Sequence, residues 1–138
     1  ASLENLAYGK PTQMSSIFDG QMPYRYYAGR AVDGEKHRGG FITLASERDP
    51  WWEIDLGKTF PIGELVIYAA RAGSRNLPIE IWAKNNDSDF HLIQKIESVS
   101  NPYPWKIFLK GDRARFIRIV GLFSGPMSFE EVEIYSAK

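Results

Sequence analysis

The chain has 138 residues, its 17 Lys and Arg residues balance its 17 Asp and Glu residues, and 43% of it is hydrophobic. That hydrophobic share is enough for a folded core and argues against disorder. The balanced charge provides neither the basic field of a nonspecific nucleic-acid binder nor a polybasic patch for an acidic membrane. There is no cysteine, which excludes disulfides, thiolate metal sites and cysteine nucleophiles.

Seven segments rich in β-branched and aromatic residues, bounded by turn-forming residues, predict strands. In chain order they are WWEIDL (51–56), ELVIYAA (64–70), PIEIWAK (78–84), HLIQKI (91–96), WKIFLK (105–110), ARFIRIVG (114–121) and FEEVEIYS (129–136). The stretch LGKTFPIG is interpreted as a break between the first two segments. No long helical pattern or internal repeat is present. The pattern predicts one all-β domain over residues 1–138, an antiparallel sandwich or barrel of about eight strands.

Alternation along residues 51–56 gives the two neighbouring tryptophans different environments. Trp52 shares a face with the apolar side chains of this segment, which predicts that it lies in the core. Trp51 shares its face with two carboxylates, and we expect it to cap the end of the sandwich with its N–H hydrogen-bonded. Trp82 and Trp105 fall within predicted strands and are expected in the core.

The first fifty residues are less regular and rich in Gly, Ser, Pro and aromatic residues. A loop-rich segment of this length in a compact domain is usually functional. It contains His37 and the tyrosines Tyr24, Tyr26 and Tyr27, which either stack on a ligand or pack a loop onto the sandwich. His91, at the start of a predicted strand, is expected on the surface.

Three phrases occur in an order that resembles the discoidin, or coagulation-factor C-type, superfamily of β-sandwich domains. They are NLAYGKPTQMSS (5–16), then AVDG (31–34) with DPWWEIDLGKTFPIGELVIY (49–68), then ARFIRIVG (114–121) with SFEEVEIY (128–135). Within the superfamily, the tryptophan pair and the closing EEVEIY run are most similar to the fucolectins, or F-type lectins. The resemblance implies a jelly-roll sandwich with ligand loops at one end, and a binding module rather than an enzyme.

The resemblance implies a fucose site built from a histidine and two basic residues, here His37, Arg71 and Arg75. The aspartate that fucolectins carry between the two basic residues is missing, as is the cysteine pair of that loop. Arginine can hold two vicinal sugar oxygens with its fixed fork, and histidine can donate or accept a hydrogen bond. Alternatively, the two arginines are solvated loop charges. An apolar stacking surface would come from nearby aromatic residues, namely Tyr26, Tyr27 and Phe41.

The resemblance also implies a structural calcium ion beside the sugar loops, with Asp33 and Glu131 as side-chain ligands. Calcium takes six to eight oxygen ligands and often combines carboxylates with backbone carbonyls. The alternative is a simple Asp33-Gly34 turn and a surface glutamate. In the calcium interpretation the remaining ligands are backbone oxygens, from Arg30, Glu35, Glu130 and the region 38–40.

These features together predict a calcium-supported carbohydrate-binding module, a lectin for fucose-like or other terminal sugars. We expect no enzymatic activity, because no GxSxG, HExxH, P-loop or dinucleotide-binding motif is present. The alternatives are a discoidin-type module that binds galactose-type glycans, anionic lipid or a protein partner, and a structural domain. The start of the chain has no signal-peptide pattern and is typical of a boundary inside a longer protein. We expect that protein to be multidomain and secreted or on the cell surface.

Overall fold

The computed structural model describes residues 4–16, 27–35, 40–44, 46–69 and 76–137. No helix among them is long and apolar enough to cross a bilayer. Every strand pairing among them is antiparallel, which confirms the prediction of an all-β antiparallel fold. The elements are β1 (Thr12–Met14), the 3-10 helix η2 (Ala28–Val32), β2 (Phe41–Ile42), β3 (Trp51–Tyr68), β4 (Ile79–Lys84), β5 (His91–Ile96), β6 (Trp105–Phe108), β7 (Arg113–Gly121), β8 (Ser128–Phe129) and β9 (Glu131–Ser136).

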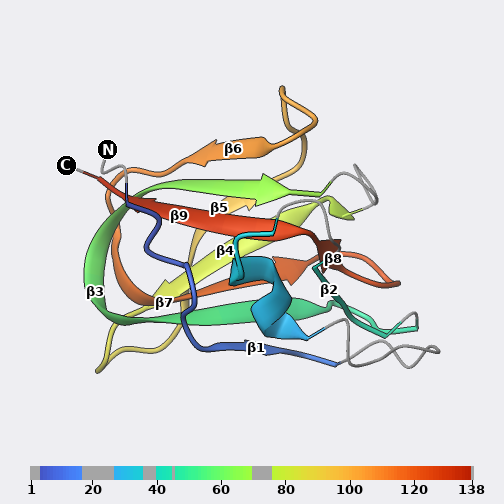
Figure 1. The fold of residues 1–138 in the computed structure, drawn as a ribbon, viewed down its shortest axis with the longest axis horizontal. Coiled ribbons are helices and arrows are strands. Elements are labelled where there is room, and N and C mark those ends of the chain that lie inside the picture. The colour runs from blue at the N-terminus through green and yellow to red at the C-terminus, as the bar shows by residue number, and fades with distance from the viewer. Residues whose placement is uncertain (1–3, 17–26, 36–39, 45, 70–75, 138) are drawn as a thin grey trace.

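One long strand, β3, belongs to both layers of the sandwich. Its first part pairs with β1 and β7, and its last part pairs with β6 and β9. One sheet therefore has the order β1-β3-β7-β4-β5, while the other places β3 between β6 and β9. Figure 1 shows β3 curving from one layer into the other at the left of the view. The predicted break at residues 56–63 is wrong, because this stretch is the bend of a continuous 18-residue strand.

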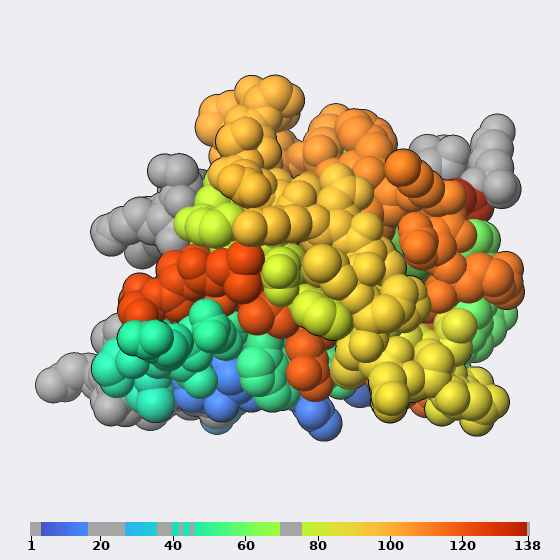
Figure 2. All heavy atoms as spheres, turned by 180° about the vertical axis from the view of Figure 1, so that it is seen from behind, coloured from blue at the N-terminus to red at the C-terminus, as the bar shows by residue number. Residues whose placement is uncertain are grey.

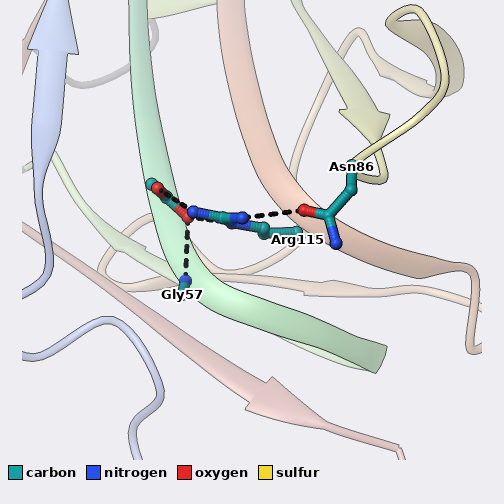
Figure 3. A network of polar contacts seen from close by, with 4 residues as sticks. Gly57, Asn86 and Arg115 are labelled. Carbon is teal, nitrogen blue, oxygen red and sulfur yellow. Dashed lines mark hydrogen bonds and ion pairs between the residues drawn. The ribbon is translucent and has the colours of Figure 1, made fainter.

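A polar network holds this bend (Figure 3). Arg115 of β7 donates two hydrogen bonds to the Asp55 carboxylate, from Nε at 2.7 Å and from Nη2 at 2.8 Å. The Nη1 group of Arg115 donates to Asn86 Oδ1 at 2.7 Å, and the Gly57 amide donates to Asp55 Oδ1 at 2.8 Å. Gly57 has φ 89°, a conformation that favours glycine, and β3 loses its register with β7 just beyond Asp55.

The core lies between the two sheets and contains two of the tryptophans. Trp52 is fully buried, and its Nε1 donates to the Ala28 carbonyl at 3.0 Å. Trp105 is buried on the facing layer, with its ring 5.8 Å from the ring of Phe129. Both positions confirm the predictions from strand alternation. His91 is exposed, as predicted.

The outer face of the larger sheet carries the other two tryptophans. Trp82 is half-buried there and its Nε1 donates to Glu80 Oε1 at 3.0 Å, so the prediction that it lies in the core is wrong. The inward positions of β4 belong instead to its buried aliphatic residues. Trp51 is also half-buried at the start of β3. The Arg118 guanidinium lies 4.4 Å from its ring centroid and 4.4 Å from that of Phe90, a cation–π arrangement on both sides.

The different environments of Trp52 and Trp82 predict different costs of mutation. Trp52→Phe should lower the free energy of unfolding by about 2 kcal/mol or more, because it leaves a cavity and removes the buried hydrogen bond from the indole to the Ala28 carbonyl. Trp82→Phe, the matched control, should cost less than about 1 kcal/mol because its site is half solvated. Urea denaturation of both variants measures the difference. Equal losses would contradict these assignments.

The network at the bend predicts a pH-dependent contribution from Asp55. Its hydrogen bonds with Arg115 hold the pKa of Asp55 below its ordinary value of 3.8. The ionised group therefore stabilises the fold above pH 3.8, and this contribution disappears as the pH falls through the lowered pKa.

Asp55→Asn should accordingly lower the Tm by a few degrees at pH 7, with a smaller difference from the wild type at about pH 3. Thermal unfolding followed by circular dichroism measures both. Asp87→Asn, at an exposed position of the β4–β5 connection, is the control and should have little effect at either pH. If the Tm difference between the wild type and Asp55→Asn is the same at both pH values, the proposed role of the ion pair is contradicted.

Candidate functional site

The stems of several connections meet at one end of the sandwich, opposite the bend of β3. In Figure 1, β1, β7 and the returning half of β3 all end on the right, where β4 begins. The short β2–β8 pair lies at this end, with Phe41 opposite Phe129 in the register. The described residues on both sides of 36–39 and of 70–75, the segments that carry the predicted histidine and arginines, lie at this end. This end of the molecule is therefore the candidate site.

A buried carboxylate, Glu131 at the start of β9, lies at this end beside Asp33. Glu131 is 1% exposed, and its Oε2 accepts a hydrogen bond from the Gly34 amide at 2.9 Å. Its Oε1 is buried and has no hydrogen-bond partner among the described residues. Burial raises the pKa of Glu131 to about 8, the Gly34 amide opposes the rise, and the neighbouring Asp33 carboxylate adds to it. Such a group either carries a proton or faces a cation.

The chemistry of this pair fits a hard cation such as calcium. Asp33 follows η2 directly, and its Oδ1 accepts the Glu35 amide at 2.9 Å while Oδ2 lies 3.6 Å from Arg30 Nε. The described residues contain no group of three or more His, Cys, Asp or Glu side chains placed to hold a metal. Backbone oxygens would therefore have to complete the coordination, as in many calcium sites. The structure thus brings the two predicted side-chain ligands together across 98 positions of sequence.

The predicted backbone ligands have partly known surroundings. Arg30 lies in the last turn of η2, three residues before Asp33, and Glu35 follows Asp33 by two residues and donates its amide to it. Glu130 is buried, its amide donates to the Tyr68 carbonyl at 2.7 Å, and its side chain accepts the Tyr103 hydroxyl at 3.2 Å. Residues 38 and 39 lie outside the described part of the chain.

The predicted ligand-binding residues have mixed outcomes. Tyr26, His37, Arg71 and Arg75 lie outside the described residues. Tyr27 is 51% exposed, beside a shallow hollow of about 410 Å³ that residues 12–14 and 27–29 line, so one ring is accessible for stacking.

Phe41 requires a correction. It is 0% exposed, and its ring packs against the rings of Trp52 and Phe129 with centroids 6.0 and 5.5 Å away. No face of this ring is open to a sugar. Phe41 belongs to the core because β2 lies against η2 and β8, a placement that a two-residue strand does not reveal in sequence.

Two side chains at this end were missed by sequence reasoning. Asn76 is 0% exposed; its Nδ2 donates to the Ser128 carbonyl at 2.9 Å, and its Oδ1 accepts the Ser128 amide at 3.0 Å. Glu47 accepts hydrogen bonds from the hydroxyls of Ser15 and Ser16, and its carbonyl accepts the Gly125 amide. The signal for Asn76 was weak: an asparagine directly before an apolar strand, where a turn residue is ordinary.

A second hollow, of about 360 Å³, lies at the same end between the start of β4 and the β5–β6 connection. Figure 2 shows this connection rising at the top of the rear face, next to the first residues of β4. Its walls are mainly apolar and include one carboxylate and one hydroxyl side chain. The lining residues are Leu77, Pro78, Glu97, Ser98, Val99, Pro102 and Trp105.

Comparison with known proteins places this geometry in a family. Residues 30–119 match the F5/F8 type C family model described as "NedA-like, galactose-binding domain". A search of curated proteins gave no match. A solved fucose binding module from Streptococcus pneumoniae is 30% identical, with a TM-score of 0.81, over 99% of this chain and 100% of that chain.

Two further structures are similar. A mutant of the lectin binding domain of lectinolysin, complexed with Lewis b, is 26% identical with a TM-score of 0.85, over 99% of both chains. A fucolectin from the serum of striped bass, Morone saxatilis, shares the fold at 22% identity and a TM-score of 0.80, over 99% of this chain and 48% of that chain. With a family model that matches well over half of its length, the chain belongs to the F5/F8 type C family of galactose-binding-like domains.

Proposed function

We propose that this protein is a carbohydrate-binding module, a lectin, that recognises fucose-like terminal sugars at the β2–β8 end of the sandwich. The observation that carries the proposal is the 30% identity with the pneumococcal fucose binding module across nearly the full length of both chains. The lectinolysin domain, whose structure was solved with Lewis b, supports the same ligand class at 26% identity.

The proposed contacts come from two loops and one exposed ring. His37 and the arginines Arg71 and Arg75 would donate and accept hydrogen bonds to sugar hydroxyls, because a neutral sugar is recognised by pre-placed polar groups. Tyr27, with half of its surface exposed, would supply the apolar face, with Tyr26 as its neighbour. The Arg-x-Asp pattern of fucolectins is incomplete here, which makes selectivity among terminal sugars the point to test.

Galactose-type glycans are the second candidate ligand. The matching family model is itself described as galactose-binding, and it covers the last residues of η2 and most strands of the larger sheet. Both candidates keep the ligand at the same end and differ in which hydroxyl geometry the loops accept.

Binding without catalysis agrees with the carboxylates of the described residues. On the outer face Glu53 is paired with Arg118 at 2.6 Å, and Asp55 with Arg115 at 2.7 Å. Glycoside hydrolysis needs two carboxyl groups that reach the scissile bond, one of them protonated. Glu131 has the raised pKa of such an acid, but it is buried beneath the turn at Gly34 and so cannot contact a glycan.

Calcium is proposed as a structural ion held by the side chains of Asp33 and Glu131. The unpartnered Oε1 of Glu131 supports this, because a cation would satisfy it and replace the proton that the raised pKa implies. The ion would fix the turn after η2 and would take no part in chemistry. Backbone carbonyls would complete its ligand set, from Arg30, Glu35 and Glu130.

The module is proposed to act as part of a larger secreted or cell-surface protein. The lectinolysin structure is described as one domain of its protein, and the striped bass fucolectin comes from serum. Weak affinity for one sugar would then be multiplied by repeated modules on one chain.

A glycan array with calcium should show binding to fucosylated glycans. Arg75→Ala should weaken binding of the best glycan by about 10-fold or more, because hydrogen bonds to a charged donor contribute about 1.5–3 kcal/mol. Arg113→Ala, at the opposite end of the sandwich, is the control and should bind as the wild type does. Calorimetric titration gives the Kd values. Binding to galactosides alone would select the second candidate, and an unchanged Kd for Arg75→Ala would exclude the proposed contact.

Calcium should raise the Tm of the wild type and have little effect on Glu131→Gln. A hundredfold excess of calcium over its Kd corresponds to about 2.7 kcal/mol of stabilisation. The metal-free variant should be about as stable as the metal-free wild type at pH 7, because Glu131 is then largely protonated and resembles the amide. Glu35→Gln keeps its backbone carbonyl and serves as the control, with the full calcium response. The proposed ion site would be refuted by equal calcium shifts in Glu131→Gln and the wild type.

A further inference from the structure

The predicted sugar-binding histidine and arginines lie in two connections, 36–39 and 70–75. The residues that flank each connection, here called its stems, contact one short segment, Ser128–Glu131, here called the anchor segment. We propose that the anchor segment sets the position of these two loops relative to each other, and that Asn76 is the positioning residue that ties the 70–75 loop to it. The link to affinity rests on the proposed sugar-binding function, whereas the anchoring itself does not.

Both stems of the 70–75 loop end on the anchor segment. On the entry side, Tyr68 is the register partner of Glu131, and its carbonyl accepts the Glu130 amide at 2.7 Å. On the exit side, the Asn76 side chain makes its two hydrogen bonds with the backbone of Ser128. One side chain thus replaces the pair of hydrogen bonds that a neighbouring strand would make. In the sequence, Asn76 directly follows Arg75, one of the proposed sugar contacts.

Both stems of the 36–39 loop end there too. On the entry side, the Gly34 amide donates to the carboxylate of Glu131 at 2.9 Å. On the exit side, Gly40 lies so close to Phe129 that a Cβ at this position would come within 1.6 Å of the Phe129 carbonyl oxygen. Only glycine allows this approach, and the next residue, Phe41, continues into the β2–β8 ladder.

The four contacts therefore reach four consecutive residues, Ser128–Phe129–Glu130 through their backbone and Glu131 through its carboxylate. The anchor segment is itself fixed on its N-terminal side, where buried Thr43 exchanges hydrogen bonds with Met127: Oγ1 accepts its amide at 2.9 Å and the Thr43 amide donates to its carbonyl at 3.0 Å. A cation at Glu131 would stabilise the same backbone. Loss of the Asn76 contacts alone should release one loop and leave the other in place.

The competing explanation is that Asn76 contributes only to stability. Asn5 provides a matched control, because its side chain also joins two backbone amides, those of Ala7 and Ile134, both at 3.0 Å, away from the anchor segment. Asn5→Ala should lower stability without affecting exchange in the 70–75 loop or sugar affinity. Asn76→Ala should lower stability and also affect both of these. Asn76→Asp keeps an acceptor for the Ser128 amide and loses the donor to its carbonyl, so it is the variant to use if Asn76→Ala does not fold.

The test has two readouts at a temperature where all variants are folded. Hydrogen exchange by mass spectrometry should show faster exchange over residues 70–75 in the Asn76 variant, with residues 36–39 unchanged and neither changed in Asn5→Ala. Titration with methyl α-L-fucoside in calcium should show a Kd raised about 10-fold or more for the Asn76 variant and unchanged for Asn5→Ala.

The outcomes separate the two proposals. Exchange at residues 70–75 that is the same in the Asn76 variant and the wild type would overturn the anchoring. A Kd within twofold of the wild type, or an equal rise in Asn5→Ala, would overturn the link to affinity. A wild type that binds no fucoside and no galactoside would refute the proposed function, and the exchange data would still decide whether Asn76 anchors its loop.

Discussion

β3 runs away from the β2–β8 end of the sandwich in one sheet, bends, and returns to that end in the other sheet. Its first residue, Trp51, and its last, Tyr68, therefore lie at the same end of the sandwich although 17 positions separate them. The bend depends on the backbone freedom of Gly57 and on the two hydrogen bonds from Arg115 to Asp55. The connections before and after β3 consequently start from the same end of the sandwich, which is the condition for a site built from distant loops.

The returning half of β3 pairs with β9, so the start of β9 lies at the same end. This places Glu131 under the turn after η2 and brings the residues that flank 36–39 and 70–75 onto one short segment, Ser128–Glu131. Asn76 and Glu131 are both buried, so water cannot satisfy their polar atoms. Each side chain therefore depends on specific partners at this end of the sandwich. The same burial disfavours the ionised form of Glu131, and a neighbouring cation would favour that form.

Strand alternation was enough to predict an all-β fold and the core position of Trp52, because both depend on local pattern. The bend was misinterpreted as a break, since the glycines and proline of LGKTFPIG are typical of turns as well as of a strongly bent strand. Trp82 was misassigned because a position within a strand does not by itself identify the face, and the alternation of β4 places Trp82 on the outer one. For Phe41, burial results from a two-residue strand whose partner lies 88 positions away.

The candidate site was harder to predict. The nearness of Asp33 and Glu131 followed from the family resemblance and not from spacing, and the role of Asn76 depends on a contact with a residue 52 positions away. Such contacts are created by tertiary structure and leave no periodic signal. The glycine at position 40 was visible in the sequence, but its close approach to Phe129 was not.

The most direct measurement is the change in backbone amide NMR shifts of the labelled protein as methyl α-L-fucoside is added in calcium. Binding at the proposed end should move the amides of Gly34, Gly40, Asn76 and Ser128 and leave those of Gly57 and Arg115 unchanged. Shifts centred on the bend or on the outer face of the larger sheet, or no shifts at all, would contradict a fucose site at this end.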